Sequence, residues 1–174
     1  MYSPNFDVIV CGSLHLDIVV DSTHLPRLDE TVVGSAWRMI CGGKGGNQAV
    51  MSARLGARTG MIGSVGRDDF GTRLLSNLQA SQVDCSEILA QEAGGSGMSV
   101  AIMTAGGDYG AVIVSGTNLA LVPEDCARQF AALGSASILI LQNEVPEAVN
   151  IAVAAAARKA GAQVILNAAP ARPV

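Results

Sequence analysis

The sequence predicts a layered α/β domain whose central sheet is mainly parallel. Of its 174 residues, 49% are hydrophobic and 15% are charged, so a single domain can bury a substantial core. Only 3% are aromatic, and a core of Val, Ile, Leu, Ala and Met suits strands that helices cover on both faces. Strand-like apolar runs alternate with helix-like segments, an order typical of parallel β-α-β units with right-handed crossovers.

Strands are expected where short apolar runs are bounded by glycine, proline or polar residues. In order, they are residues 7–11, 18–20, an extended segment at 30–40, 59–65, 99–104, 111–115, 137–141 and 163–166. The first strand turns at Gly12-Ser13 and continues after a polar interruption that contains Asp17. Residues 106–108, Gly-Gly-Asp, separate two of these runs and indicate an antiparallel hairpin inserted between the parallel units.

Helices are expected where apolar residues recur at helical spacing. In order, they cover residues 45–55, 68–80, 123–133 and 146–159. In the first helix, Ala49 and Leu55 lie on or near one face, and Gly56 stops the helix. Asp68 and Asp69 suit the positive N-terminal end of the second helix, and the last two helices open with a proline.

Composition argues against several classes of protein. The net charge is -4 and the 11 Lys and Arg residues are scattered, so no nucleic-acid partner is expected. The N-terminus lacks the basic and apolar regions of a signal peptide, which predicts a cytoplasmic protein with no membrane contact. Neither the two His nor the four Cys residues have metal-ligand or disulfide-framework spacing, and we expect no metal site: His15, His24, Cys11, Cys41, Cys85 and Cys126.

Residues 42–47, Gly-Gly-Lys-Gly-Gly-Asn, form a glycine-rich entrance to the first helix. A P-loop would need glycine where Arg38 stands and Ser or Thr where Gly45 stands, and a dinucleotide fingerprint would need a third glycine in place of Gln48. Both phosphate fingerprints therefore fail. The glycines would still let a ligand approach closely, and the helix would offer it free N–H groups, although a tight packing turn is the alternative. Lys44 is either a ligand contact or a solvated surface charge.

Three polar residues are expected at the carboxyl ends of strands, where ligands collect in parallel sheets. They are Asp17, Glu144 and Asn167. Asp17 interrupts an apolar pattern, so it needs a partner or a ligand such as a pair of sugar hydroxyls, unless it is a solvated bulge residue. The position of Glu144 is equally consistent with an acidic residue in an ordinary loop. Asn118 is also a candidate for the site, although its position favours a helix cap or turn. The sequence contains no Ser-His-Asp set.

At these residues the chain resembles the N-terminal half of the ribokinase family of carbohydrate kinases. The shared segments, in the family's order, are Gly12-Ser13 with Asp17, residues 42–49, residues 63–66 with Asp68 and Gly71, residues 116–118, residues 141–144 and residues 167–172. The resemblance implies a three-layer ribokinase-like fold, with a mainly parallel central sheet and a small β lid, whose C-terminal portion is missing. Residues 1–174 would be the N-terminal part of one domain, with lid strands within about 15–40 and 97–116.

The resemblance also implies an activity, the ATP-dependent transfer of phosphate to a primary sugar hydroxyl with Mg²⁺ and often a monovalent cation. The small-molecule sugar or nucleoside would be held by Asp17, Gly42, Gly43, Lys44, Asn47, Asn118, Glu144 and His15. His15 stands where ribokinases proper tend to carry Asn, so the resemblance does not identify the sugar. The lid would close over the ligand and pair with another subunit in a homodimer.

No catalytic residue is expected within this chain. The resemblance places the general base, the anion hole and most of the ATP pocket beyond residue 174, so we expect a fragment that binds neither ATP nor Mg²⁺ well and is inactive alone. The alternative is a non-catalytic sugar-binding or dimerisation module. A dinucleotide-binding oxidoreductase domain is disfavoured by the failed fingerprint.

Overall fold

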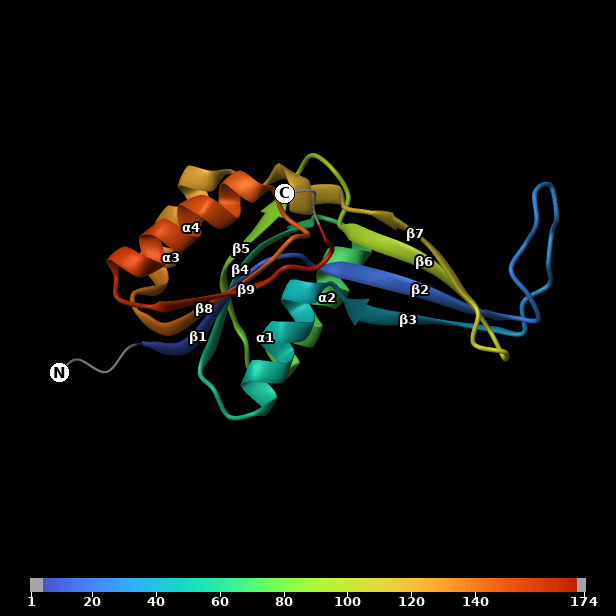
Figure 1. Cartoon of the computed structure of the whole chain (residues 1–174), viewed down its shortest axis with the longest axis horizontal. Coiled ribbons are helices and arrows are strands. Elements are labelled where there is room, and N and C mark those ends of the chain that lie inside the picture. Colours follow the sequence, from blue (N-terminus) through green and yellow to red (C-terminus); the bar gives the residue numbers. More distant parts are fainter. Residues whose placement is uncertain (1–4, 172–174) are drawn as a thin grey trace.

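The computed structural model describes residues 5–171, which form a parallel sheet in a rounded body and a smaller sheet that projects from it (Figure 1). The parallel sheet has the strand order β5-β4-β1-β8-β9, and every neighbouring pair is parallel. In chain order, its strands are β1 (Phe6–Cys11), β4 (Thr59–Gly66), β5 (Asp84–Gln91), β8 (Ala136–Gln142) and β9 (Gln163–Asn167). The predicted parallel sheet is therefore confirmed.

Helices lie on both faces of this sheet, α1 and α2 on one face and α3 and α4 on the other (Figure 1). Their bounds are α1 (Lys44–Arg54), α2 (Asp69–Ala80), α3 (Pro123–Leu133) and α4 (Glu147–Lys159). Side chains along β1 point alternately to the two faces of the sheet. Val8 and Val10 pack with α1 and α2, while Ile9 and Cys11 pack with α3 and α4. Both faces of the sheet are buried, which confirms the three-layer α/β architecture.

The helix ends largely follow the signals in the sequence. The Asp68 carboxylate accepts the Gly71 N–H at 2.7 Å and so caps α2, and Pro123 lies in the first turn of α3. Gly56 follows α1 with φ +92°, a left-handed conformation that favours glycine. The expectation for Leu55 was wrong: it follows the last residue of α1 and is 80% exposed, because helical geometry places it about 120° around the axis from the buried Ala49.

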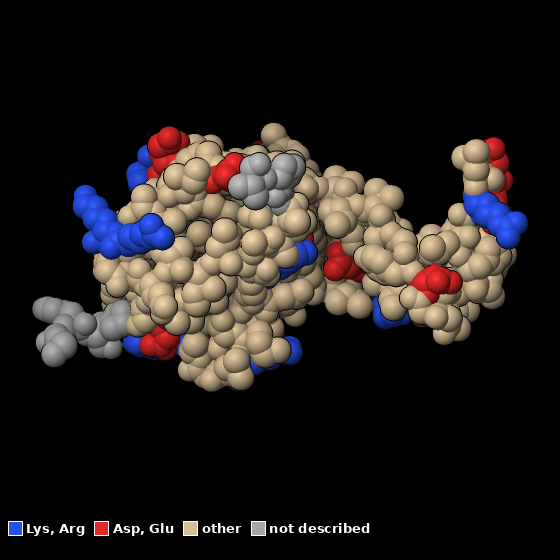
Figure 2. All heavy atoms as spheres, viewed as in Figure 1, with Lys and Arg blue, Asp and Glu red and all other residues tan. Residues whose placement is uncertain are grey.

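The small sheet has the order β3-β2-β6-β7 and forms the arm at the right of Figures 1 and 2. Its strands are β2 (His15–Ser22), β3 (Ala36–Gly42), β6 (Gly97–Thr104) and β7 (Tyr109–Val114). β2 pairs antiparallel with β3 and parallel with β6, and the β6–β7 hairpin is antiparallel as predicted. Most of the arm's visible surface is uncharged, and charged atoms gather at its far tip (Figure 2).

Three sequence predictions need correction. The residues after the first turn do not continue the first strand in its own sheet, because β2 leaves the body and starts the small sheet. Of the extended segment expected at 30–40, only the part from Ala36 is a strand; Val33 is 87% exposed in the loop that precedes it. β5 was not expected, since it lies at the sheet edge and its mixed polar residues give no apolar run.

The strand order reverses between β1 and β8. From β1 the parallel sheet grows through β4 to β5 on one side, and β8 and β9 lie on the other. The loops after β1 and β8 therefore leave the same edge of the sheet from adjacent strands, the usual location of ligand sites in such folds. Within residues 5–171, no helix is long and apolar enough to cross a membrane.

Candidate functional site

The loop after β1 carries Ser13 to this edge of the parallel sheet. The Gly12 N–H donates to the Ile62 carbonyl at 3.1 Å, and the chain enters β2 at His15. A Cβ on Gly12 would overlap the Gln142 side chain of β8, so glycine leaves room here for the Gln142 carboxamide. Ser13 is fully buried, and its hydroxyl has to find partners within the protein.

The glycine cluster lets α1 approach this loop closely. Gly43 is the N-cap residue with φ +83°, and a Cβ there would lie within 3.0 Å of the backbone of Ser13, Leu14 and His15. A Cβ on Gly45 would also meet the Ser13 backbone. Packing of helix against loop therefore explains much of the cluster, and contact with a ligand stays a prediction.

The first N–H groups of α1 are already used inside the chain. The Lys44 N–H donates to Glu144 Oε2 at 2.9 Å, and the Gly46 N–H donates to the Ser13 carbonyl at 2.9 Å. The Gly45 N–H lies 3.4 Å from Ser13 Oγ. The expectation that a ligand finds these groups free was therefore wrong, because the chain's own carboxylate occupies the positive end of the helix.

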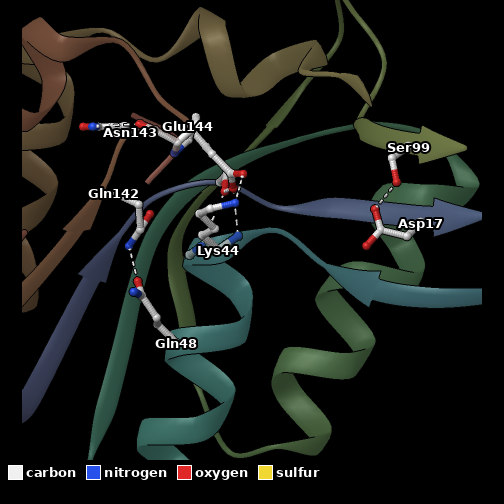
Figure 3. Close-up of polar contacts among 10 residues, drawn as sticks. Asp17, Lys44, Gln48, Ser99, Gln142, Asn143 and Glu144 are labelled. Carbon is white, nitrogen blue, oxygen red and sulfur yellow. Dashed lines mark hydrogen bonds and ion pairs between the residues drawn. The ribbon is translucent and has the colours of Figure 1, made fainter. Parts of the chain in front are cut away.

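Glu144, two residues beyond β8, is the centre of this arrangement (Figure 3). Its Oε2 accepts the Ser13 hydroxyl at 2.5 Å, and its Oε1 pairs with Lys44 Nζ at 2.8 Å. Its side chain is only 11% exposed. Burial alone would raise the pKa of Glu144, but the hydrogen bonds from Lys44 and Ser13 and the lysine charge outweigh it and lower the pKa. Glu144 is therefore ionised at neutral pH, and Lys44 is no free surface charge.

Asp17 lies in β2, on the small sheet, and not at the carboxyl end of a body strand as expected. Its Oδ1 accepts the Ser99 hydroxyl at 2.6 Å (Figure 3), and its Oδ2 lies against Gly42. Within residues 5–171, no group donates a hydrogen bond to Oδ2. This oxygen is thus an available acceptor.

His15 begins β2 and lines a cleft of about 290 Å³ together with Glu144. The other lining residues are Ile113, Ser115, Leu119, Asn143 and Pro170. His15 is 5% exposed, and its Nε2 is buried without a partner among the described residues. Burial lowers the pKa of His15, although the charges of Glu144 and Asp17 oppose this shift. The cleft therefore presents a neutral imidazole beside a carboxylate, in a volume suited to a small polar ligand.

The remaining predicted residues differ in how much they can offer a ligand. Asn118 is fully buried, and its side chain bonds both the N–H and the carbonyl of Leu14 at 2.9 Å and the Ser115 carbonyl at 2.8 Å. It braces the loop before β2, so its contact with a ligand stays a prediction. Asn47 is exposed near the start of α1, and its contact with a ligand stays a prediction. Asn167 ends β9 opposite Gln142, at the predicted edge.

Three polar residues at this site carry no separate signal in the sequence. Ser13 was read only as a turn, and Ser99 only as part of an apolar strand. Gln142 Nε2 donates to Gln48 Oε1 at 2.5 Å and joins β8 to α1 (Figure 3). Each of these contacts links positions 82 to 131 residues apart, so only the pairing of strands and loops brings them together.

The described residues do not fit a magnesium site. Within residues 5–171, no group of three or more His, Cys, Asp or Glu residues could hold a metal ion. Glu144, the acid of the cleft, is already engaged by Lys44 and Ser13. The Mg²⁺ that the resemblance implies would therefore need ligands other than a cluster of these residues.

The fold and the site together define a class: three-layer α/β proteins with a polar ligand cleft where the strand order reverses and a small sheet projecting beside it. The family model for pfkB family carbohydrate kinases matches residues 5–174, and the chain belongs to this family. The family resemblance seen in the sequence is thereby confirmed.

Similarity to ribokinases supports this assignment. The chain is 36% identical to ribokinase from Bacillus subtilis over 170 residues, which is 97% of this chain and 57% of that protein. It is 33% identical to mouse ribokinase, with 94% of this chain and 51% of that protein covered. The structure of Arabidopsis thaliana ribokinase with ribose and ATP matches with a TM-score of 0.82 and 31% identity, covering 95% of this chain and 53% of that one. The chain thus spans about half the length of the relatives it matches.

Proposed function

We propose that residues 1–174 are the sugar-binding half of an ATP-dependent carbohydrate kinase that phosphorylates a primary sugar hydroxyl. The observation that carries this proposal is the available Asp17 Oδ2 on the small sheet, together with the ionised Glu144 in the cleft. A carboxylate with a free oxygen accepts hydrogen bonds from hydroxyl groups. The Arabidopsis relative was solved with ribose and ATP, which supports a sugar as the ligand class.

Each predicted site residue takes a role in this proposal. Asp17 would accept sugar hydroxyls, and the backbone of Gly42 and Gly43 would allow the ring to approach closely. Asn47 adds an exposed amide. Four further residues complete the proposed site. His15 and Glu144 line the cleft, and Lys44 lies next to it, paired with Glu144. Asn118 lies behind the loop that precedes β2.

The small sheet is the proposed lid, and the face turned away from Asp17 is the proposed dimer surface. Strand register places Trp37, Val100 and Val112 on that face, where they are 65%, 39% and 70% exposed. Apolar side chains gathered on one sheet face favour association with a second copy. Sedimentation equilibrium at micromolar concentration should give a dimer, and a monomer would remove this part of the proposal.

Phosphate transfer itself is assigned to the whole protein. ATP, Mg²⁺ and a monovalent cation would bind mainly through the half that the relatives possess beyond the matched region. Because phosphoryl transfer depends on positioning and on charge stabilisation, we propose that this chain alone turns over negligible ATP. Turnover that depends on sugar and survives removal of host kinases would refute this.

A thermal-shift screen of sugars and nucleosides tests the binding proposal, since a ligand of the folded state raises its melting temperature. Asp17→Ala should weaken binding by about 2 to 4 kcal/mol in calorimetric titration, because hydrogen bonds to a charged group are lost. Asp21→Ala is the matched control, as Asp21 lies in the same strand but pairs with Arg38. Equal affinities of the two variants would remove Asp17 from the site. Binding without turnover in a full-length version would favour the non-catalytic module.

A further inference from the structure

Ser99 faces Asp17 across the β2–β6 pair of the small sheet. The two residues are direct register partners, and the Ser99 hydroxyl donates to Asp17 Oδ1 at 2.6 Å (Figure 3). Ser99 is 6% exposed, so little water competes for this bond. We propose that Ser99 is a positioning residue that fixes the Asp17 carboxylate for sugar binding. This inference rests on the function proposed above.

Gly42 confines the same carboxylate from the other side. β2 lies between β3 and β6, so Asp17 has a neighbouring strand on each side. A Cβ added to Gly42 would overlap Asp17 Oδ2, and its three nearest atoms would all belong to the Asp17 carboxyl group. With Ser99 holding Oδ1, the carboxylate cannot swing aside to make room for a methyl group.

The consequence is a carboxylate that is oriented before any ligand arrives. Ser99 holds Oδ1 of Asp17. Oδ2 lies above the backbone of Gly42 and accepts no hydrogen bond from residues 5–171. A ligand hydroxyl then does not have to immobilise the side chain on binding, which reduces the entropy lost. Without Ser99, Asp17 is free to rotate, and both the orientation and the confinement are lost.

A double-mutant cycle without ligand tests whether Ser99 holds Asp17. Gly42→Ala should lower the melting temperature by about 5 °C when Ser99 is present, and by about 2 °C or less in the Ser99→Ala background, where Asp17 can move aside. Gly110→Ala is the matched control, since a Cβ there meets only the Leu25 side chain at ordinary contact distance. Equal shifts from Gly42→Ala in both backgrounds would overturn the proposal.

A second cycle tests the link to binding, using D-ribose and each sugar that shifts melting in the screen as probes. Ser99→Ala should weaken binding about tenfold, and Ser99→Thr, which keeps the hydroxyl, should restore it. Ser22→Ala, in the same sheet but remote from Asp17, should leave the affinity unchanged. In an Asp17→Ala background, Ser99→Ala should have no further effect.

The outcomes separate the two proposals. If Ser99→Ala weakens binding equally with and without Asp17, Ser99 contacts the sugar directly and its positioning role is refuted. If the unaltered chain binds none of the sugars, the proposed function fails, while the melting cycle still decides whether Ser99 holds Asp17. A melting cycle that shows no coupling refutes the inference, whether or not sugars bind.

Discussion

Replacing Glu144 with Gln should destabilise the fold by about 2 kcal/mol at neutral pH. The carboxylate accepts hydrogen bonds from Ser13 Oγ and from the backbone and side chain of Lys44, at 2.5 to 2.9 Å. Gln keeps one acceptor oxygen, but its NH₂ group takes the place of the other oxygen. This group faces a donor from Lys44 or Ser13, so a hydrogen bond is lost there. A hydrogen bond to a charged group contributes about 1.5 to 3 kcal/mol. The Lys44 side chain is 38% exposed, so solvent screens its ion pair and we take the lower part of that range.

The same contacts also make the stability depend on pH. The pKa of Glu144 is lowered in the folded state from its ordinary value of 4.5. Its ionised form therefore stabilises the fold above pH 4.5, and this stabilisation is lost as the pH falls through the lower, folded-state pKa. The difference in unfolding free energy between the unaltered protein and Glu144→Gln should accordingly shrink below pH 4.5.

Urea unfolding followed by circular dichroism measures both effects. Glu147→Gln is the matched control, because Glu147 is exposed in the first turn of α4 and should cost less than about 0.5 kcal/mol. If the two variants lose equal stability at pH 7, or if the gap for Glu144→Gln is as large at pH 3 as at pH 7, Glu144 does not hold the helix entrance as described.

Two further predictions concern the surroundings of the site. Asp68→Ala should cost about 2 kcal/mol in urea unfolding, because it removes the α2 cap and two hydrogen bonds from Ser96; Asp69→Ala should cost far less, and equal losses would contradict this. Burial lowers the pKa of His15 from its ordinary value of 6.5. The contribution of the neutral imidazole to the stability of the fold is therefore present above pH 6.5, and it is lost as the pH falls toward the folded-state pKa. His15→Gln should flatten stability between pH 7.5 and 5.5, and an unchanged slope would refute it.

Local signals predicted much of the fold. α3 begins at Pro123 and ends at Leu133, as expected, because proline at the start and regular apolar spacing act within the segment itself. The Asp68 cap was predictable for the same reason. Such features depend on neighbours in sequence, and single-sequence patterns record them directly.

Features that depend on distant partners were harder to predict. The apolar residues near Val33 resemble a strand, yet within the described part of the chain no strand pairs with them and they lie in an exposed loop. The polar β5 is a strand only because β4 offers it an edge. At the site, the sequence pattern could place Glu144 at the end of a strand. Its hydrogen bond with the first N–H of α1, however, depends on how closely the glycines let the helix approach Ser13. Residue types alone do not give that distance.

The charges around the helix entrance favour a neutral ligand over an anionic one. Glu144 neutralises both Lys44 and the positive end of α1, so neither remains to attract a phosphate. Among residues 5–171, no cation pairs with the Asp17 carboxylate, and His15 stays neutral because burial lowers its pKa. In the proposed site, a sugar would donate its hydroxyl groups to Asp17, whereas an anion would be repelled. The carboxylate at this helix entrance thus belongs to the chain itself, which agrees with the failure of both phosphate fingerprints.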